Sequence, residues 1–129
     1  MFKLVFDEKT NILLIEINAE LSSEEFLKYE LHNIHKGIDE IDIKRNMNRL
    51  FDCKKLIIHD SDINMSETFG EITNQYNKKY TNIKIAIVAL SDVTFGNFRA
   101  HEVYGELPNI ERQVFRSVKK AKEWLLNFV

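Results

Sequence analysis

The sequence predicts an α/β protein with a single mixed, mostly parallel five-stranded sheet flanked by four helices. Apolar runs alternate with amphipathic segments, which gives the element order β-β-α-β-α-β-α-β-α. The run Ile83 to Ala89 is continuously hydrophobic apart from Lys84, as is typical of a strand covered on both faces inside a sheet. The first two apolar runs have no helix between them, so one antiparallel strand must join an otherwise parallel set.

The composition is that of one ordinary globular domain spanning residues 1–129. Hydrophobic residues make up 44% and charged residues 29%, which is enough apolar matter for one core. The net charge of −2 predicts no general nucleic-acid-binding surface. The single cysteine, Cys53, cannot form an intramolecular disulfide, which favours a reducing compartment. No signal-peptide-like or membrane-length apolar run is present, so we expect a cytoplasmic protein without stable membrane insertion.

The first third of the chain predicts a hairpin followed by a helix. Phe2 to Phe6 alternate with the period of a strand, and Ile12 to Ile17 form the second strand. Ser22 with Glu25 three residues later forms a capping box that opens a helix. Gly37 is expected to mark the end of that helix. Its apolar face has the helical spacing of Leu27, Leu31, Ile34 and Ile38.

The rest of the chain alternates strands and helices after an unassigned segment, Lys36 to Asn48. Leu50 to Cys53 predict a short strand, and Ser66 is expected to cap the next helix. A further helix should run from Asp92 to about Glu106, and Ile110 to Arg116 predict the last strand. Residues that should face the core from these helices and from a final one capped by Ser117 are Phe69, Ile72, Tyr76, Ala100, Val103, Tyr104, Leu107, Val118, Ala121, Leu125 and Phe128.

The step from the apolar strand into Ser91-Asp92 is the most informative junction. Loops at the carboxyl end of a buried strand commonly bind ligands in open α/β sheets, and helix N-termini favour anions. Ser91 as a helix cap is the favoured interpretation, because Asp92 would repel an anion. Gly96 inside a helix costs about 1 kcal/mol relative to alanine, so close packing or access for a partner are both open explanations.

Other chemistry-bearing residues do not form a recognisable catalytic motif. His32 and His35 stand three apart on a helix, but a third zinc ligand is not apparent nearby, so a solvated helix face is favoured. His59 beside Asp60 and Ser61, or Cys53 with a distant histidine, would need converging geometry to act as a hydrolase. We therefore predict no catalytic residues, no metal and no cofactor.

With these elements in hand, the chain resembles a STAS-type domain, the superfamily of anti-sigma-factor antagonists, and more closely its SpoIIAA-like branch. The resemblance rests on FDEKTNILLIEINAELSSEEF, on NRLFDCKKL with its apolar pair before Asp52, and on IKIAIVALSDVTFGNFRAHE. The final VFRSVKKAKEWL is its most specific part, and it resembles the end of small bacterial proteins of this branch. The resemblance covers nearly the whole chain and implies a mixed sheet flanked by helices.

The resemblance implies a function in signalling rather than catalysis. The best understood relatives bind partner proteins and are switched by phosphorylation of a serine between a strand and a helix. That position would fall at Ser61 or Ser66 here, although Asp62-Ile63-Asn64 replaces the small-residue segment that follows the serine in the antagonists. Our first hypothesis is a non-catalytic regulatory module. Its regulatory protein partner would contact the residues Phe95, Gly96, Arg99 and Glu102.

Two further hypotheses remain open at this stage. One is a carrier of a small apolar ligand or lipid, since some members of the branch resemble lipid-transfer folds; its pocket would be lined by Phe69, Phe95, Phe98 and Tyr104. The other is a small hydrolase that uses Ser61 or Cys53 with His59. The exposed edge of the opening hairpin also offers a way to pair two chains, so a homodimer is an alternative to a monomer.

Overall fold

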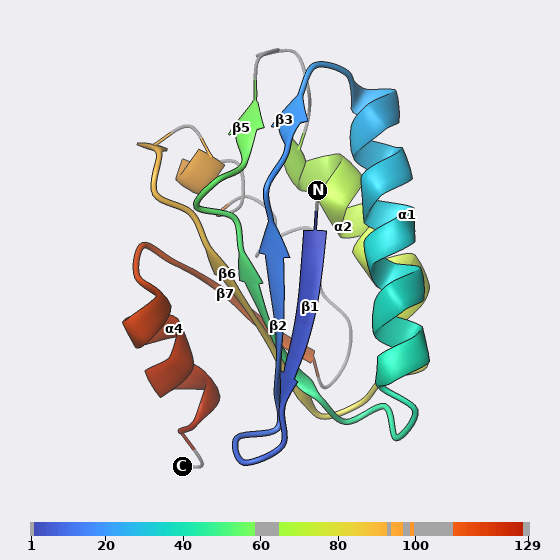
Figure 1. The fold of residues 1–129 in the computed structure, drawn as a ribbon, viewed down its shortest axis with the longest axis vertical. Coiled ribbons are helices and arrows are strands. Elements are labelled where there is room, and N and C mark those ends of the chain that lie inside the picture. Colours follow the sequence, from blue (N-terminus) through green and yellow to red (C-terminus); the bar gives the residue numbers. More distant parts are fainter. Residues whose placement is uncertain (1, 59–64, 93, 97–98, 100–109, 128–129) are drawn as a thin grey trace.

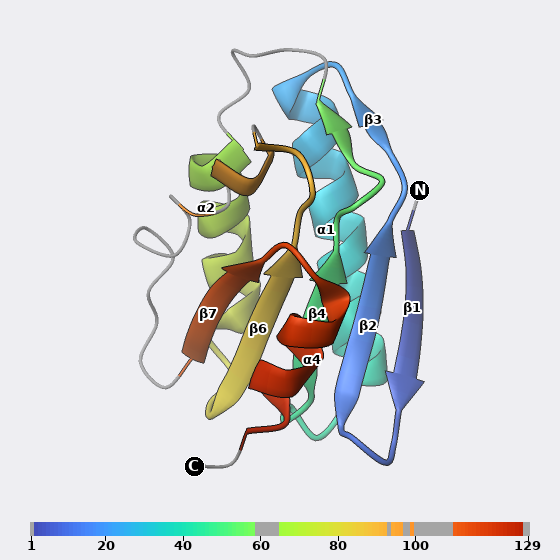
Figure 2. The same cartoon turned by 90° about the vertical axis from the view of Figure 1, so that its left-hand side faces the viewer.

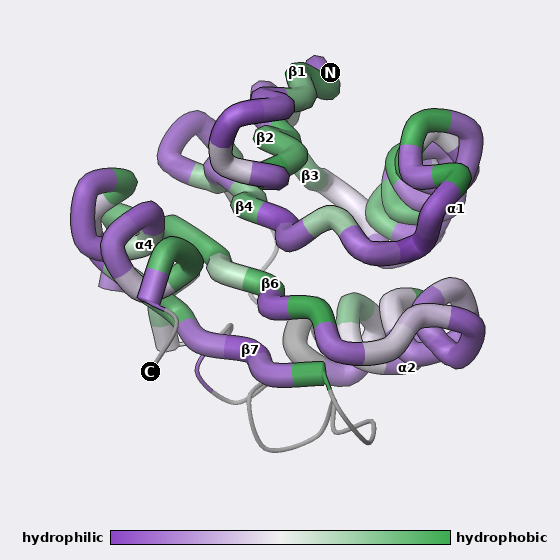
Figure 3. Tube along the Cα trace, turned by 90° about the horizontal axis from the view of Figure 1, so that it is seen from below, coloured by the Kyte–Doolittle hydropathy of each residue, from purple (hydrophilic) through white to green (hydrophobic). Residues whose placement is uncertain are grey.

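The computed structural model describes residues 2–58, 65–92, 94–96, 99 and 110–127, and it has the predicted α/β architecture. A central sheet is covered by helices α1 and α2 on one face and by helix α4 on the other (Figures 1 and 3). Helical backbone is also present at Asp92, Thr94 to Gly96 and Arg99, at the end of the sheet near the N-terminus of the chain. Within these ranges no helix is both long enough and apolar enough to cross a membrane.

The five-stranded sheet has the order β1-β2-β4-β6-β7. Strands β2, β4, β6 and β7 are parallel to one another, and β1 is antiparallel to β2, as predicted. The bounds are β1 Phe2–Asp7, β2 Ile12–Ile17, β3 Glu20–Leu21, α1 Glu24–Ile41, β4 Asn48–Asp52, β5 Ile57–Ile58, α2 Met65–Asn77, β6 Ile83–Val88, β7 Ile110–Phe115 and α4 Val118–Leu125.

Strand β6 confirms the interpretation of its apolar run, because it lies between β4 and β7 and is covered on both faces. Ile85 and Ile87 belong to the core cluster that contains the residues of α1 and α2. Ala86 and Val88 belong to a second cluster, which includes Ala121 and Leu125 of α4. The two-residue period of the strand therefore divides one continuous run between two cores.

A second, two-stranded parallel sheet was not predicted. It pairs β3 with β5, with Glu20 opposite Ile57 and Leu21 opposite Ile58. Strands of two residues are too short to show a periodicity in the sequence, so only the tertiary structure reveals their pairing.

The predicted boundaries of α1 were wrong at both ends, although its apolar face was confirmed. Ser23 rather than Ser22 is the N-cap, since its hydroxyl accepts a hydrogen bond from the Phe26 N–H at 3.2 Å. The helix continues through Gly37 to Ile41. A Cβ on residue 37 would lie 2.8 Å from Cδ1 of Leu4, so glycine there permits close packing of α1 on β1.

The other helix starts were predicted with mixed success. Ser66 is not a cap, because α2 begins at Met65 and Ser66 lies within its first turn. Ser117 is the N-cap of α4, and its hydroxyl accepts a hydrogen bond from the Lys120 N–H at 3.2 Å. The predicted inner residues Phe69 and Ile72 of α2 are buried. Those proposed at Ala100 to Leu107 and at Phe128 lie outside the described residues.

A buried ion pair connects the loop after α1 to the middle strand of the sheet. Arg49 of β4 is fully buried and donates a hydrogen bond from Nη2 to Asp42 at 3.2 Å. Asp42 also accepts the backbone N–H groups of Asn46 and Met47, each at 3.1 Å. The Arg49 guanidinium lies 4.2 Å from the centre of the Tyr80 ring. Burial lowers the pKa of Arg49, whereas Tyr80, Asp42 and Asp39 raise it.

We expect the Asp42→Ala variant to lose about 3–5 kcal/mol of unfolding free energy, because it leaves a buried cation without its counter-ion. Urea denaturation monitored by circular dichroism measures this loss. Glu40→Ala is the matched control, since Glu40 is an exposed carboxylate near the same helix end. A loss no larger than that of the control would mean that Asp42 does not stabilise Arg49.

Candidate functional site

The carboxyl ends of the parallel strands meet along one edge of the sheet. Strands β2, β4, β6 and β7 all end at this edge, and the short helical segment after β6 lies beyond it (Figure 2). Open α/β sheets usually bind their ligands or partners at such an edge. We call the part of it formed by Leu90, Ser91, Asp92, Phe95, Gly96, Arg99 and Arg116 the β6–β7 corner.

Ser91 caps the helical segment of the corner, as the sequence predicted. Its hydroxyl accepts a hydrogen bond from the Thr94 N–H at 3.1 Å and donates one to Oγ1 of Thr94 at 2.8 Å. The Ser91 carbonyl accepts the Phe95 N–H at 2.8 Å. The Ser91 hydroxyl and the Thr94 N–H are therefore already used, which favours capping over anion binding here.

Arg116, just beyond β7, forms hydrogen bonds to the segment that follows β6. It donates one hydrogen bond from Nη1 to the Leu90 carbonyl at 2.9 Å and another from Nη2 to Oδ1 of Asp92 at 2.8 Å. Both side chains of this ion pair are largely exposed, so the pair itself contributes at most about 1 kcal/mol. Its main effect is to hold the backbone after β6 in one position.

The guanidinium groups of two arginines lie near the ring of Phe95. The guanidinium carbon of Arg116 is 4.1 Å from the ring centre and that of Arg99 is 6.0 Å from it. Phe95 is half-buried and packs against the core cluster shared with α1 and α2. Leu90, whose carbonyl accepts the hydrogen bond from Arg116, is 54% exposed. The corner thus presents an aromatic ring, an aliphatic side chain and two cations to solvent.

Close packing, one of the two predicted explanations for Gly96, is not seen against the described part of the chain. Among the residues that the structure describes, a Cβ placed on residue 96 would meet nothing within 4 Å, and Gly96 is exposed. The alternative explanation, access for a partner at this point of the corner, remains a prediction.

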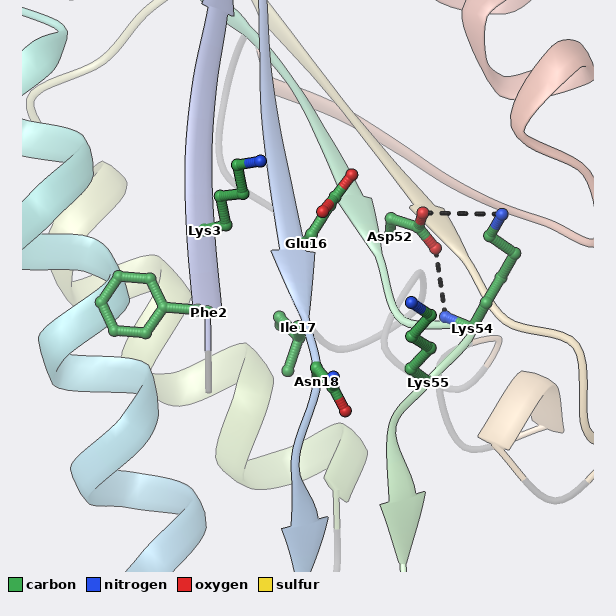
Figure 4. A pocket seen from close by; sticks show the side chains of 8 residues that line it. All are labelled: Phe2, Lys3, Glu16, Ile17, Asn18, Asp52, Lys54 and Lys55. Carbon is green, nitrogen blue, oxygen red and sulfur yellow. Dashed lines mark hydrogen bonds and ion pairs between the residues drawn. The ribbon is translucent and has the colours of Figure 1, made fainter.

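A polar hollow of about 380 Å³ opens at the same edge of the sheet, beside the ends of β2 and β4. Its lining is shown in Figure 4 and consists of Phe2, Lys3, Glu16, Ile17, Asn18, Asp52, Lys54 and Lys55. Asp52 accepts the backbone N–H of Lys54 at 3.2 Å and pairs with its ammonium group at 3.7 Å. The hollow mixes three cations with two carboxylates, so its charge does not select one class of ligand.

Comparison with known proteins identifies the fold. No family model matches the chain, and no curated protein sequence does. A solved structure from Shewanella loihica PV-4, an uncharacterised protein from the DUF3478 family with a SpoIIAA-like fold, superposes with a TM-score of 0.61. The match covers 97% of this chain and 92% of that one at 13% sequence identity. The chain has a SpoIIAA-like fold. At this identity the likeness concerns the fold alone.

In this SpoIIAA-like fold the predicted contact residues Phe95, Gly96 and Arg99 are brought together at the β6–β7 corner. Glu102, Phe98 and Tyr104 lie outside the described residues, as do Ser61 and His59. Arg116 and the exposed Leu90 were not predicted as part of the site. The Val-Phe-Arg segment offered a signal for Arg116, because an arginine ending one parallel strand lies beside the loop that follows its neighbour.

The proposed apolar ligand pocket is not supported at Phe69. This ring is buried and packs edge-on against Phe51, with 5.6 Å between ring centres. Phe69 lines a small cavity of about 20 Å³ beside Leu27, Leu31 and Ile34. That volume holds roughly one water molecule, whereas small-ligand pockets measure roughly 300–1,000 Å³.

The two helix histidines are internal hydrogen-bonding residues. Nδ1 of His32 lies 2.8 Å from the Tyr76 hydroxyl, and Nε2 of His35 lies 3.3 Å from Oγ1 of Thr73. The His35 ring also stacks on Tyr76, with 5.1 Å between ring centres. The predicted solvated helix face was therefore wrong for His35, which is buried. In the part of the chain that the structure covers, no group of His, Cys, Asp or Glu is placed to hold a metal ion.

Cys53 is not suited to act as a nucleophile. Its thiol is buried at the end of β4, and burial together with the charge of Asp52 raises its pKa. Because the thiolate is the reactive species, a raised pKa suppresses its reactivity at neutral pH.

We expect the Gly96→Ala variant to be more stable than the wild type by up to about 1 kcal/mol, because alanine favours a helix and the site has open space. Gly37→Ala is the matched control in another helix, where the added methyl group must displace the Leu4 side chain. Thermal unfolding of both variants measures the difference. A destabilised Gly96→Ala variant would contradict the open environment.

We expect His35 to make stability depend on pH. Burial, and then the positive charge of Arg49, lower the pKa of His35 from 6.5 to about 3. Below pH 6.5 the unfolded chain binds a proton that the folded chain excludes, so the free energy of unfolding falls as pH drops from 6.5 towards 3. The slope of this term approaches about 1.4 kcal/mol per pH unit.

Urea denaturation at pH 7 and pH 5 measures this contribution, within a range where few carboxylates titrate. His35→Gln should flatten the dependence, whereas His32→Gln should leave it in place because His35 is retained. Equal slopes in the wild type and the His35→Gln variant would show that His35 is not the responsible group.

Proposed function

We propose that this chain is a non-catalytic regulatory module that binds a partner protein through the β6–β7 corner. The observation that carries the proposal is the half-buried Phe95 ring with the guanidinium groups of Arg99 and Arg116 near it, in a corner that also contains the exposed Leu90. Aromatic residues and arginines are the side chains that most often dominate the energy of protein–protein interfaces. A rigid ring whose arginine neighbours are already in place loses little conformational entropy on binding.

The geometry of the corner favours a protein over a small molecule. The corner has a half-buried aromatic ring, an exposed leucine and an exposed glycine, and a surface of that kind suits a flat contact. The SpoIIAA-like fold and the resemblance to anti-sigma-factor antagonists support the same proposal. The burial of Cys53 supports the absence of catalysis, and the small cavity at Phe69 does not favour the carrier hypothesis.

Phosphorylation of a serine would be the switch in this proposal. Ser66 lies in the first turn of α2, where a phosphate would be stabilised by the positive end of the helix dipole. Ser61 remains the alternative position suggested by the resemblance. Mass spectrometry of the protein purified from its own cells distinguishes the two serines.

The test is affinity capture with a tagged protein from cells that naturally contain it. The double variant Phe95→Ala/Arg99→Ala should lower capture of the specific partner by at least about tenfold, since loss of such anchors costs 1–2 kcal/mol or more. Lys28→Ala/Tyr29→Ala is the matched control, because it removes an exposed cation and an exposed aromatic ring from α1.

Circular dichroism confirms that both double variants are folded before capture is compared. If the variant at the corner captures every protein as well as the wild type does, the corner is not the contact surface. If both double variants lose the same partner, the contact is not specific to the corner.

A further inference from the structure

Strand β1 is a free edge of the main sheet. It pairs with β2, and in the part of the chain that the structure describes no strand pairs with its other side. Figure 2 shows β1 at the outer side of the sheet, with α1 behind the inner strands rather than across the edge. A strand of six residues with an open edge can pair with an extended segment of another chain.

The hydrogen bonds of β2 show which backbone groups of β1 are free. The Asn48 N–H of β4 donates to the Asn11 carbonyl at 3.0 Å. Along β2, the backbone N–H and C=O groups of odd-numbered residues therefore point towards β4, and those of even-numbered residues point towards β1. The β1 residues opposite the even-numbered residues of β2 are Lys3, Val5 and Asp7, and their backbone groups form the hydrogen bonds to β2. The residues whose backbone N–H and C=O groups point to the open edge are therefore Phe2, Leu4 and Phe6.

We propose that two copies of this chain form a dimer by antiparallel pairing of their β1 strands around a two-fold axis at Val5. This register places Leu4 opposite the partner's Phe6, so the outward backbone groups of both residues form hydrogen bonds. It also places Lys3 opposite the partner's Asp7, and Asp7 opposite the partner's Lys3. The two sheets then become one continuous sheet across the dimer.

Charge complementarity selects this register. Lys3, Val5 and Asp7 are exposed on the same face of β1, and Val5 is 44% exposed. A two-fold axis at Val5 forms two ion pairs around an apolar contact between the two valines. An axis at Lys3 or Asp7 would set like charges against each other, and an axis at Leu4 or Phe6 would form no ion pair. Lys3 also lies opposite Glu16 of β2, which adds a second carboxylate near the same cation.

The face of β1 opposite to Lys3, Val5 and Asp7 lies beside an apolar patch. A hollow of about 450 Å³ lies beside β1 and is lined by Phe6, Glu8, Ile41 and Ile43, among others. Ile43 is 81% exposed and Ile41 is 37% exposed, which leaves an apolar patch open to solvent. The register sets the partner's Phe2 opposite Glu8, next to this hollow. Dimerisation would thus bring the partner's β1 beside this patch.

Charge reversal tests the register by sedimentation equilibrium over a range of protein concentrations. Lys3→Glu and Asp7→Lys should each raise the dissociation constant by on the order of tenfold or more, because each sets like charges in direct opposition. The combined variant Lys3→Glu/Asp7→Lys should restore dimerisation, since it exchanges the two charges. Both substitutions fall on exposed side chains, so circular dichroism should show the wild-type fold for all three variants.

Mixing the two single variants gives a sharper result. An equimolar mixture of Lys3→Glu and Asp7→Lys should form a heterodimer even where each alone is monomeric, because every charged position then faces its opposite. Lys28→Glu is the control, because it reverses an exposed charge on α1 and should leave the wild-type dissociation constant unchanged.

A disulfide test reports the axis directly. In the proposed register the two Val5 Cα atoms lie about 4.5 Å apart, within disulfide range, so Val5→Cys should form a covalent dimer on mild oxidation. Lys3→Cys should not, since the two positions would lie about 14 Å apart along the strands. The wild-type Cys53 is buried and should not cross-link.

Two outcomes would overturn the proposal. One is a wild type that stays monomeric at every concentration at which it remains dissolved. The other is a dimer that neither charge reversal weakens and that Val5→Cys does not cross-link, which would place the interface elsewhere. The dimer does not depend on the β6–β7 corner, so Phe95→Ala/Arg99→Ala should leave the dissociation constant unchanged.

Discussion

The parallel pairing of β2, β4, β6 and β7 is the constraint on which the rest of the structure depends. Parallel strands all end at the same edge, and the connections between them must cross a face of the sheet as helices. That arrangement places the turn after β6 beside the end of β7. Arg116 can then hold the Leu90 carbonyl and Asp92 although more than twenty residues separate them in the sequence.

Burial on both faces of the sheet has a second consequence at its centre. Helices α1 and α2 meet over one face with polar as well as apolar residues, and Arg49 of β4 is fully buried beneath them. The pair that it forms with Asp42 holds the loop after α1 against the sheet. A hydrophobic residue of similar volume would often stabilise such a position as well, so the pair fixes the arrangement more than it adds stability.

The antiparallel strand β1 completes the sheet but leaves one edge open. Its inner face packs against α1, where Gly37 allows the helix to approach Leu4. Its outer face carries a lysine and an aspartate on either side of an exposed valine. Edge strands usually carry charges that discourage pairing, but opposite charges placed symmetrically about one residue favour pairing with a second copy. In our two proposals, the β6–β7 corner and this edge serve separate roles on one sheet.

The sequence alone determined the fold class, the apolar faces of α1, α2 and α4, the buried strand β6 and the caps at Ser91 and Ser117, because these depend on local periodicity and short-range hydrogen bonds. The sequence did not predict the boundaries of α1 at Ser23 and Ile41, because Ser22 is a cap candidate directly beside Ser23. It also did not predict the short β3–β5 pair, because strands of two residues carry too weak a local signal. Only the tertiary structure placed Arg116 on Phe95, buried His35 against Tyr76 and gave Gly96 open space. Those contacts join segments far apart in the chain, and only the packing of the helices on the sheet decides which distant segments meet.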